Sequence, residues 1–142
     1  MDEQRYFASL MLAKHLGVIA KEYVVDAAVE AIGKVKEPEY WLIELSYDGE
    51  SQHLSKFINS ADDVVFKGAL RFAFDAWQEK KISLEKFVSC CESLWKKAGT
   101  NSKWYEDLVW IAAELNLVEQ GVFVKADSEE KIRKEVAGML EE

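Results

Sequence analysis

Apolar residues recur at three- and four-residue intervals along most of this 142-residue sequence, and this spacing is the feature that most narrows its fold. Positions i, i+3, i+4 and i+7 lie on one side of an α-helix, so the pattern predicts amphipathic helices. Only one proline interrupts the chain, and proline is the strongest helix breaker. The clearest example runs from Leu84 to Ala98, where the spacing is kept throughout. The sequence therefore predicts an all-α protein.

The residues between the apolar runs predict where the helices begin and end. Glycine tolerates the left-handed conformation that terminates helices, so Gly17 and Gly33 are predicted to end two of them. Pro38 is predicted in the first turn of another helix, and Ser60 and Asp127 are predicted as N-terminal caps. The predicted helices cover residues 3–17, 20–32, 38–46, 51–58, 61–80, 84–98, 102–115 and 128–140.

The connections between these helices are short, which favours antiparallel neighbours. We therefore expect residues 1–142 to form a single-domain antiparallel bundle of about six to eight helices. Val122-Phe123-Val124 is predicted as an extended connection, because a lone strand would have no partner. Hydrophobic residues make up 49% of the chain, which is enough for a core without a metal or disulfides.

The first residues and the cysteines indicate a reducing compartment. The N-terminal segment carries acids where a signal peptide needs positive charge, and no apolar run approaches the roughly 18 residues that span a bilayer. The adjacent Cys90 and Cys91 are poorly placed for a disulfide within one helix, and Cys91 fits the core. We expect a cytoplasmic protein.

The net charge of −8 argues against nucleic-acid binding, which depends on lysine and arginine contacts to phosphates. It suits a basic partner instead. The charge is uneven, because residues 37–63 contain seven acidic residues and only one lysine, Lys56. Most of the excess negative charge therefore lies in less than a fifth of the chain.

Catalytic and cofactor motifs are hard to find in this sequence. Neither a GxGxxG nor a GxxxxGK[ST] loop occurs, and HExxH is absent. The one set that could form a catalytic group is His53 with Asp48, Ser51 or Ser55, and His53 also fits the polar face of a short helix. We therefore expect no cofactor, no metal site and no enzymatic activity, with a hydrolase based on His53 as the weakest alternative.

The acidic segment also contains aromatic residues at helical spacing. If the predicted helix over residues 38–46 buries Trp41 and Leu45, then Tyr40, Glu44 and Tyr47 form one row on its opposite side. Tyrosines supply binding area at a low cost in entropy, and carboxylates steer a basic partner. The alternative is an ordinary solvated acidic face.

The stretch EPEYWLIELSYDGE, Glu37 to Glu50, resembles segments of bacterial immunity proteins from contact-dependent growth-inhibition and polymorphic toxin systems. The resemblance covers about a tenth of the chain. Such proteins are small, acidic, cytosolic and non-enzymatic, and each binds a toxin domain, often a basic nuclease. The resemblance implies that this chain neutralises a cognate toxin by tight binding, either over the toxin's active site or beside it.

The residues expected to contact such a partner are those of the acidic, tyrosine-containing segment. They are Glu37, Glu39, Tyr40, Glu44, Tyr47, Asp48, Glu50, Asp62 and Asp63. A non-enzymatic helical adaptor or regulatory subunit is the alternative function. A homo-oligomer is also left open, since Trp104, Tyr105 or Trp110 could serve a dimer interface if they are exposed.

Overall fold

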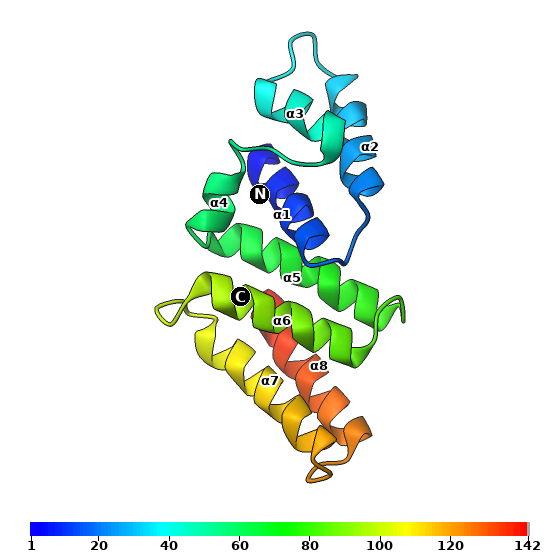
Figure 1. Cartoon of the computed structure of the whole chain (residues 1–142), viewed down its shortest axis with the longest axis vertical. Helices are drawn as coiled ribbons and strands as arrows, with labels where there is room; N and C mark the ends of the chain where they lie inside the picture. Colours follow the sequence, from blue (N-terminus) through cyan, green and yellow to red (C-terminus); the bar gives the residue numbers. More distant parts are fainter. Residues whose placement is uncertain (142) are drawn as a thin grey trace. The chain divides into compact units, whose positions relative to one another are not determined.

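The computed structural model describes residues 1–141, which form eight helices and no strand (Figure 1). The all-α prediction is confirmed. The helices are α1 (Glu3–His15), α2 (Lys21–Ile32), α3 (Tyr40–Asp48), α4 (Ser55–Asn59), α5 (Asp63–Gln78), α6 (Leu84–Ala98), α7 (Tyr105–Glu119) and α8 (Lys125–Glu141). None of the helices in this part of the chain is long and apolar enough to cross a membrane.

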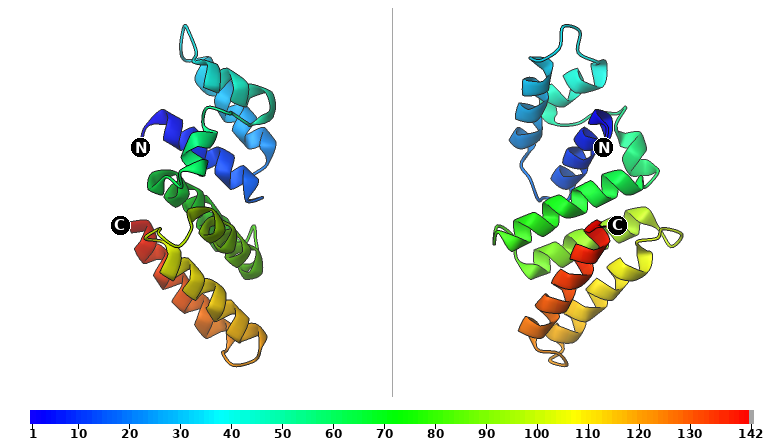
Figure 2. Two further views of the ribbon diagram at one scale, coloured as in Figure 1. Left: turned by 60° about the vertical axis from the view of Figure 1, so that its left-hand side comes forward. Right: turned by 180° about the vertical axis from the view of Figure 1, so that it is seen from behind.

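The chain divides into two compact units, Met1–Phe72 and Ala73–Glu142, with the boundary inside α5. In the first unit α2 and α3 lie side by side and antiparallel, and α1 packs on α2 and α4 (Figures 1 and 2). In the second unit α7 packs on both α6 and α8, and α7 and α8 run antiparallel. The prediction that residues 1–142 form one domain stays a prediction.

Helix α1 is the central element of the first unit. Seven consecutive residues, Phe7–Ala13, are buried, whereas a helix on the surface of a core buries one side only. The α1 helix is therefore enclosed on all sides over this stretch. Tyr6 lies four residues before Leu10, a spacing that places both on one side of a helix, but Tyr6 is 42% exposed whereas Leu10 is fully buried.

Helices α1 and α5 approach closely at Ser9 and Gly68. A Cβ atom added to Gly68 would lie 2.8 Å from Ser9 Cβ and still closer to Ser9 Oγ. The hydroxyl of Ser9, itself buried, lies 2.9 Å from the carbonyl oxygen of Arg5 and 3.3 Å from that of Val65. Because glycine has no side chain, Gly68 lets α5 approach α1 this closely.

The predicted helix ends are partly correct. Gly17 has a φ of +75°, and the Val18 N–H donates to the Ala13 carbonyl, so this glycine terminates α1 as predicted. Gly33 ends α2 as predicted, but it does so with a φ of −65°, so the left-handed turn expected at this glycine was wrong. Gly49 takes the left-handed conformation instead, at the end of α3.

Several predicted helix starts were wrong by a few residues. Pro38 lies outside α3, which begins at Tyr40 with Glu39 as its N-cap. The cap of α5 is Asp62 in place of Ser60, because the Val65 N–H donates to Asp62 Oδ1. Asp127 lies in the first turn of α8. A local sequence pattern cannot settle such choices between neighbouring capping residues.

The core of the second unit follows the predicted spacing closely. Trp77 and Phe87 stack with their ring centroids 4.9 Å apart. Cys90 and Cys91 are both buried and are not joined in a disulfide, and burial raises the pKa of each thiol. Trp104 is also buried, so it is not an exposed aromatic residue available to a dimer, whereas Trp110 is 39% exposed.

Replacing Gly68 by alanine should destabilise the protein. Alanine is the better helix former by about 0.5–1 kcal/mol, but forcing a methyl group into a packed contact costs about 1–3 kcal/mol. We expect Gly68→Ala to lower the urea midpoint measured by far-UV circular dichroism.

The matched control is Gly138→Ala, because a Cβ atom at Gly138, also helical, meets open space. This variant should raise the midpoint. Combining Gly68→Ala with Ser9→Gly should recover part of the loss. Equal effects of the two single alanine variants would contradict the close approach of α1 and α5.

Candidate protein-binding surface

The α3 helix buries one side and exposes the other. Trp41, Leu42 and Leu45 are buried, which fixes the rotation of the helix about its axis. Tyr40 and Tyr47 consequently point outward and are 75% and 78% exposed. They are the two most exposed aromatic side chains among the described residues.

A shallow hollow of about 310 Å³ lies on this outer side. It is lined by Tyr40, Glu44, Tyr47, Asp48, Glu50 and Gln52, and we call this set the α3 hollow. Five of its six residues are among the predicted contact residues. Gln52 was not predicted, since it follows the helix and carries neither charge nor ring.

Glu50 differs from the other acids of the hollow because α1 neutralises it. Its Oε1 lies 2.7 Å from Lys14 Nζ and 2.5 Å from His15 Nε2. Lys14 Nζ also donates to the carbonyl oxygen of Gly49, 3.0 Å away. Glu50 therefore connects the end of α3 to the end of α1, and less of its charge is available to a partner.

Glu44 and Asp48 each use one carboxylate oxygen locally. Glu44 Oε1 accepts from Ser51 Oγ at 3.2 Å, and Asp48 Oδ1 accepts from the Glu50 N–H at 3.1 Å. The other carboxylate oxygen of Glu44 and that of Asp48 form no hydrogen bond or ion pair with the described residues. These two oxygens stay available to a bound group beside the tyrosines.

The remaining predicted residues lie away from the hollow. Glu39 accepts from Trp41 Nε1 at 2.7 Å and borders a different depression, together with Asp2 and Arg5. Glu37 lies in the exposed loop before α3. Asp63 is the exposed first residue of α5.

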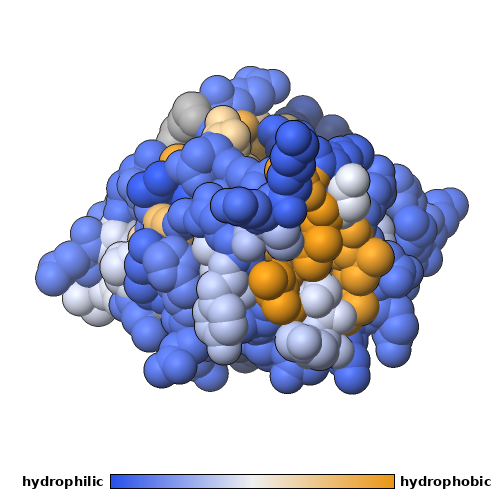
Figure 3. All heavy atoms as spheres, turned by 90° about the horizontal axis from the view of Figure 1, so that it is seen from above, coloured by the Kyte–Doolittle hydropathy of each residue, from blue (hydrophilic) through white to orange (hydrophobic). Residues whose placement is uncertain are grey.

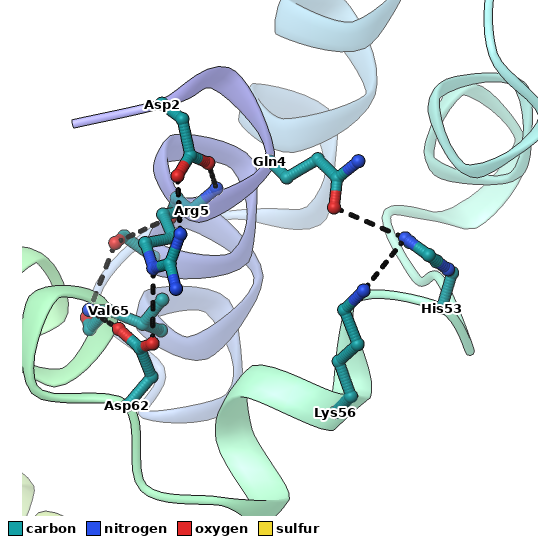
Figure 4. A network of polar contacts seen from close by, with 8 residues as sticks. Asp2, Gln4, Arg5, His53, Lys56, Asp62 and Val65 are labelled. Carbon is teal, nitrogen blue, oxygen red and sulfur yellow. Dashed lines mark hydrogen bonds and ion pairs between the residues drawn. The ribbon is translucent and has the colours of Figure 1, made fainter.

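Asp62 has a structural role in the first unit (Figure 4). Its carboxylate caps α5 and lies 3.1 Å from Arg5 Nε. Arg5 also pairs with Asp2 at 2.5 Å and lies over the Phe57 ring, 5.0 Å from its centroid. The backbone N–H and side chain of Arg5 lower the pKa of Asp2, and bonds to Asp2 and then to Asp62 raise the pKa of Arg5.

The residues proposed for the hydrolase alternative are not joined into a catalytic group. His53 Nε2 lies 3.2 Å from Gln4 Oε1 and 3.3 Å from Lys56 Nζ (Figure 4). The Ser51 hydroxyl donates to Glu44, and the Ser55 hydroxyl donates to the Ser51 carbonyl oxygen. Among residues 1–141, no three histidine, cysteine or acidic side chains are grouped so that they could hold a metal ion.

Helix α2 is less buried than its sequence predicted. The apolar spacing of residues 20–32 places Val24, Ala28 and Val29 inward. Val24 and Ala28 are fully buried, but Val29 is 54% exposed, and Val35 in the following loop is 50% exposed. Figure 3 looks onto the α2–α3 end of the first unit and shows an apolar area among polar atoms on that face. The sequence signal for this exposure was present, because α2 has apolar residues on more than one side.

Comparison with known proteins gives no relative for this chain. No protein-family model, no curated protein and no solved structure matches it.

Replacing Asp62 should test its structural role. Asp62→Ala removes both the cap of α5 and the Arg5 pair, and we expect a loss of about 1–2 kcal/mol in the free energy of unfolding. Asp62→Asn should lose less, because asparagine caps helices as well as aspartate does. Urea unfolding measures both changes.

Asp26→Ala is the control, since Asp26 is an exposed acid within α2. Alanine favours a helix interior over aspartate, so its stability should be unchanged or slightly higher. If Asp62→Ala were as harmless as Asp26→Ala, Asp62 would be free for a role in partner binding.

Proposed function

We propose that this chain is a cytoplasmic immunity protein that binds and neutralises a cognate toxin domain through the α3 hollow. The observation that carries the proposal is the pair of tyrosines, each about three-quarters exposed, beside Glu44 and Asp48 on one side of a short helix. Large exposed aromatic side chains are frequent binding hot spots. The likeness of residues 37–50 to immunity-protein segments supports the choice of partner.

The chemistry of the hollow suits a basic partner. A nuclease must present positive charge to hold phosphates, and carboxylates can occupy that positive surface in place of the nucleic acid. Glu44 and Asp48 supply negative charge to the lining of the hollow, while the charge of Glu50 is balanced by α1. The proposed contact surface is therefore centred on Tyr40, Glu44, Tyr47 and Asp48, with Glu37, Glu39 and Asp63 outside the hollow.

A helical adaptor is the second candidate, and the exposed apolar residues of the α2–α3 end favour it. Val29 and Val35 are each at least half exposed, and Figure 3 shows a contiguous apolar area on this face. Contiguous exposed apolar areas often mark a contact with another protein. Gene order separates the two candidates. A toxin gene directly upstream favours immunity, whereas its absence favours the adaptor.

Co-purification tests the partner directly. The tagged chain, expressed with its neighbouring genes, should retain a stoichiometric basic protein that is toxic when it is expressed alone. Loss of toxicity on co-expression would support neutralisation. Recovery of the chain alone, with no toxic neighbour, would contradict the proposal.

Variants of the hollow test the contact surface. Replacing both Tyr40 and Tyr47 by alanine should weaken binding to the toxin by about 2 kcal/mol or more, as removal of a hot spot does. Asp48→Lys should lower the association rate constant with the toxin. Because salt screens charges, the difference in this rate constant between the variant and the original chain should shrink as the salt concentration increases. Both effects can be measured by surface plasmon resonance at several salt concentrations.

Two exposed residues outside the hollow provide controls. Tyr23 is a half-exposed tyrosine of α2, and Glu119 is an exposed acid at the end of α7 in the second unit. Tyr23→Ala and Glu119→Lys should leave affinity and association rate nearly unchanged. Equal losses at the control positions would show that the contact surface lies elsewhere.

A further inference from the structure

We infer that the α3 hollow is a receptor for a single arginine side chain of the partner, held between the rings of Tyr40 and Tyr47 and the carboxylates of Glu44 and Asp48. This inference rests on the proposed function, because it names the partner group that the same surface would take. Its support is a chemical arrangement that the protein already uses for two of its own arginines.

The first of these is Arg5. Its guanidinium pairs with Asp2 and Asp62, at 2.5 and 3.1 Å, and lies 5.0 Å from the centroid of the Phe57 ring. A planar guanidinium combines stacking on an aromatic face with hydrogen bonds in its own plane. Both kinds of contact are satisfied at Arg5.

The second is Arg133 in the other unit. Its Nη1 lies 2.9 Å from Glu130 Oε2, its Nε donates to Gln78 Oε1 at 2.9 Å, and it lies 5.2 Å from the centroid of the Trp77 ring. This site combines an aromatic ring, a carboxylate and a side-chain amide. The guanidinium of Arg133 contacts all three of these groups at once.

The α3 hollow has the same components without the arginine. It offers two tyrosine rings, the carboxylates of Glu44 and Asp48, and the amide of Gln52, and no lysine or arginine is among the described residues that line it. Lys14 Nζ pairs with Glu50 and donates to the backbone carbonyl oxygens of Asp48 and Gly49, and it forms no ion pair with the carboxylate of Glu44 or Asp48. A positively charged group is therefore the ligand that would complement the hollow.

Arginine fits this site better than lysine. The free oxygens of Glu44 and Asp48 belong to residues four apart on α3, and the forked N–H groups of a guanidinium can reach two acceptors at once. Arginine also stacks on aromatic rings, whereas an ammonium acts as a compact and strongly hydrated point charge. We therefore expect a preference for arginine over lysine, and for either over a neutral side chain.

The test is an NMR titration of the whole ¹⁵N-labelled chain with N-acetyl-arginine methylamide. The matched probes are the lysine derivative and the citrulline derivative, which is a neutral analogue of arginine. Arginine should cause saturable shifts confined to the amides of residues 40–52, lysine should bind more weakly, and citrulline should cause no saturable shift. Shifts spread over the whole surface, or equal shifts with citrulline, would overturn the inference.

Variants identify the groups that hold the probe. Tyr40→Ala and Tyr47→Ala should each weaken arginine binding about 2- to 5-fold, the effect of one exposed cation–π contact, whereas Tyr47→Phe should keep the affinity. Asp48→Asn, which can still accept the Glu50 N–H, should weaken binding through loss of charge alone. Tyr23→Ala should have no effect, and a loss as large as that of Tyr47→Ala would overturn the assignment.

The two proposals fail separately. If the arginine probe does not bind but Asp48→Lys still impairs toxin binding, the surface is correct and the arginine receptor is wrong. If the probe binds at residues 40–52 but no toxic partner is recovered, the receptor stands and the proposed immunity function fails.

Discussion

The enclosure of α1 is the constraint on which the first unit depends. Because Phe7–Ala13 are buried on every side, α1 cannot shift without opening the core around it. The polar residues at the two ends of α1 are therefore held in defined positions within the first unit. Arg5, before the buried run, holds Asp62 at the start of α5, and Lys14 and His15, after it, hold Glu50 beyond α3. The candidate surface is thus positioned by contacts with a helix that contributes nothing to its lining.

This arrangement divides the acidic residues of one short segment into two groups with different consequences. Glu50 and Asp62 pair with basic side chains of the chain itself, and those ion pairs offset part of their charge. Glu44 and Asp48 keep an oxygen directed to neither backbone nor base among the described residues. A count of charges along the sequence treats all of them alike, whereas the field that a partner meets depends on the second group.

The exposure of Tyr40 and Tyr47 leaves two large apolar rings in solvent unless another molecule covers them. The chain buries Trp41 and Leu45 from the same helix, so α3 had core positions available for aromatic residues. Two phenol rings in solvent gain no burial energy in the isolated protein. Together with the free carboxylate oxygens they form a surface suited to protein recognition, which is the physical basis of the proposed function.

The sequence by itself determined the helical class, the ranges of most helices to within a few residues and the rotation of α3 that places Tyr40, Glu44 and Tyr47 on one side. Each of these follows from the spacing of apolar residues along a single helix, which is local information. Only the tertiary structure decided that α1 is buried all round, that Val29 is exposed and that Gly68 faces Ser9. It also decided which acids are occupied, since Lys14 and Glu50 lie 36 positions apart in sequence and Arg5 and Asp62 lie 57 apart. Such pairs form because packing brings distant segments together, and no local pattern records which charge will meet which.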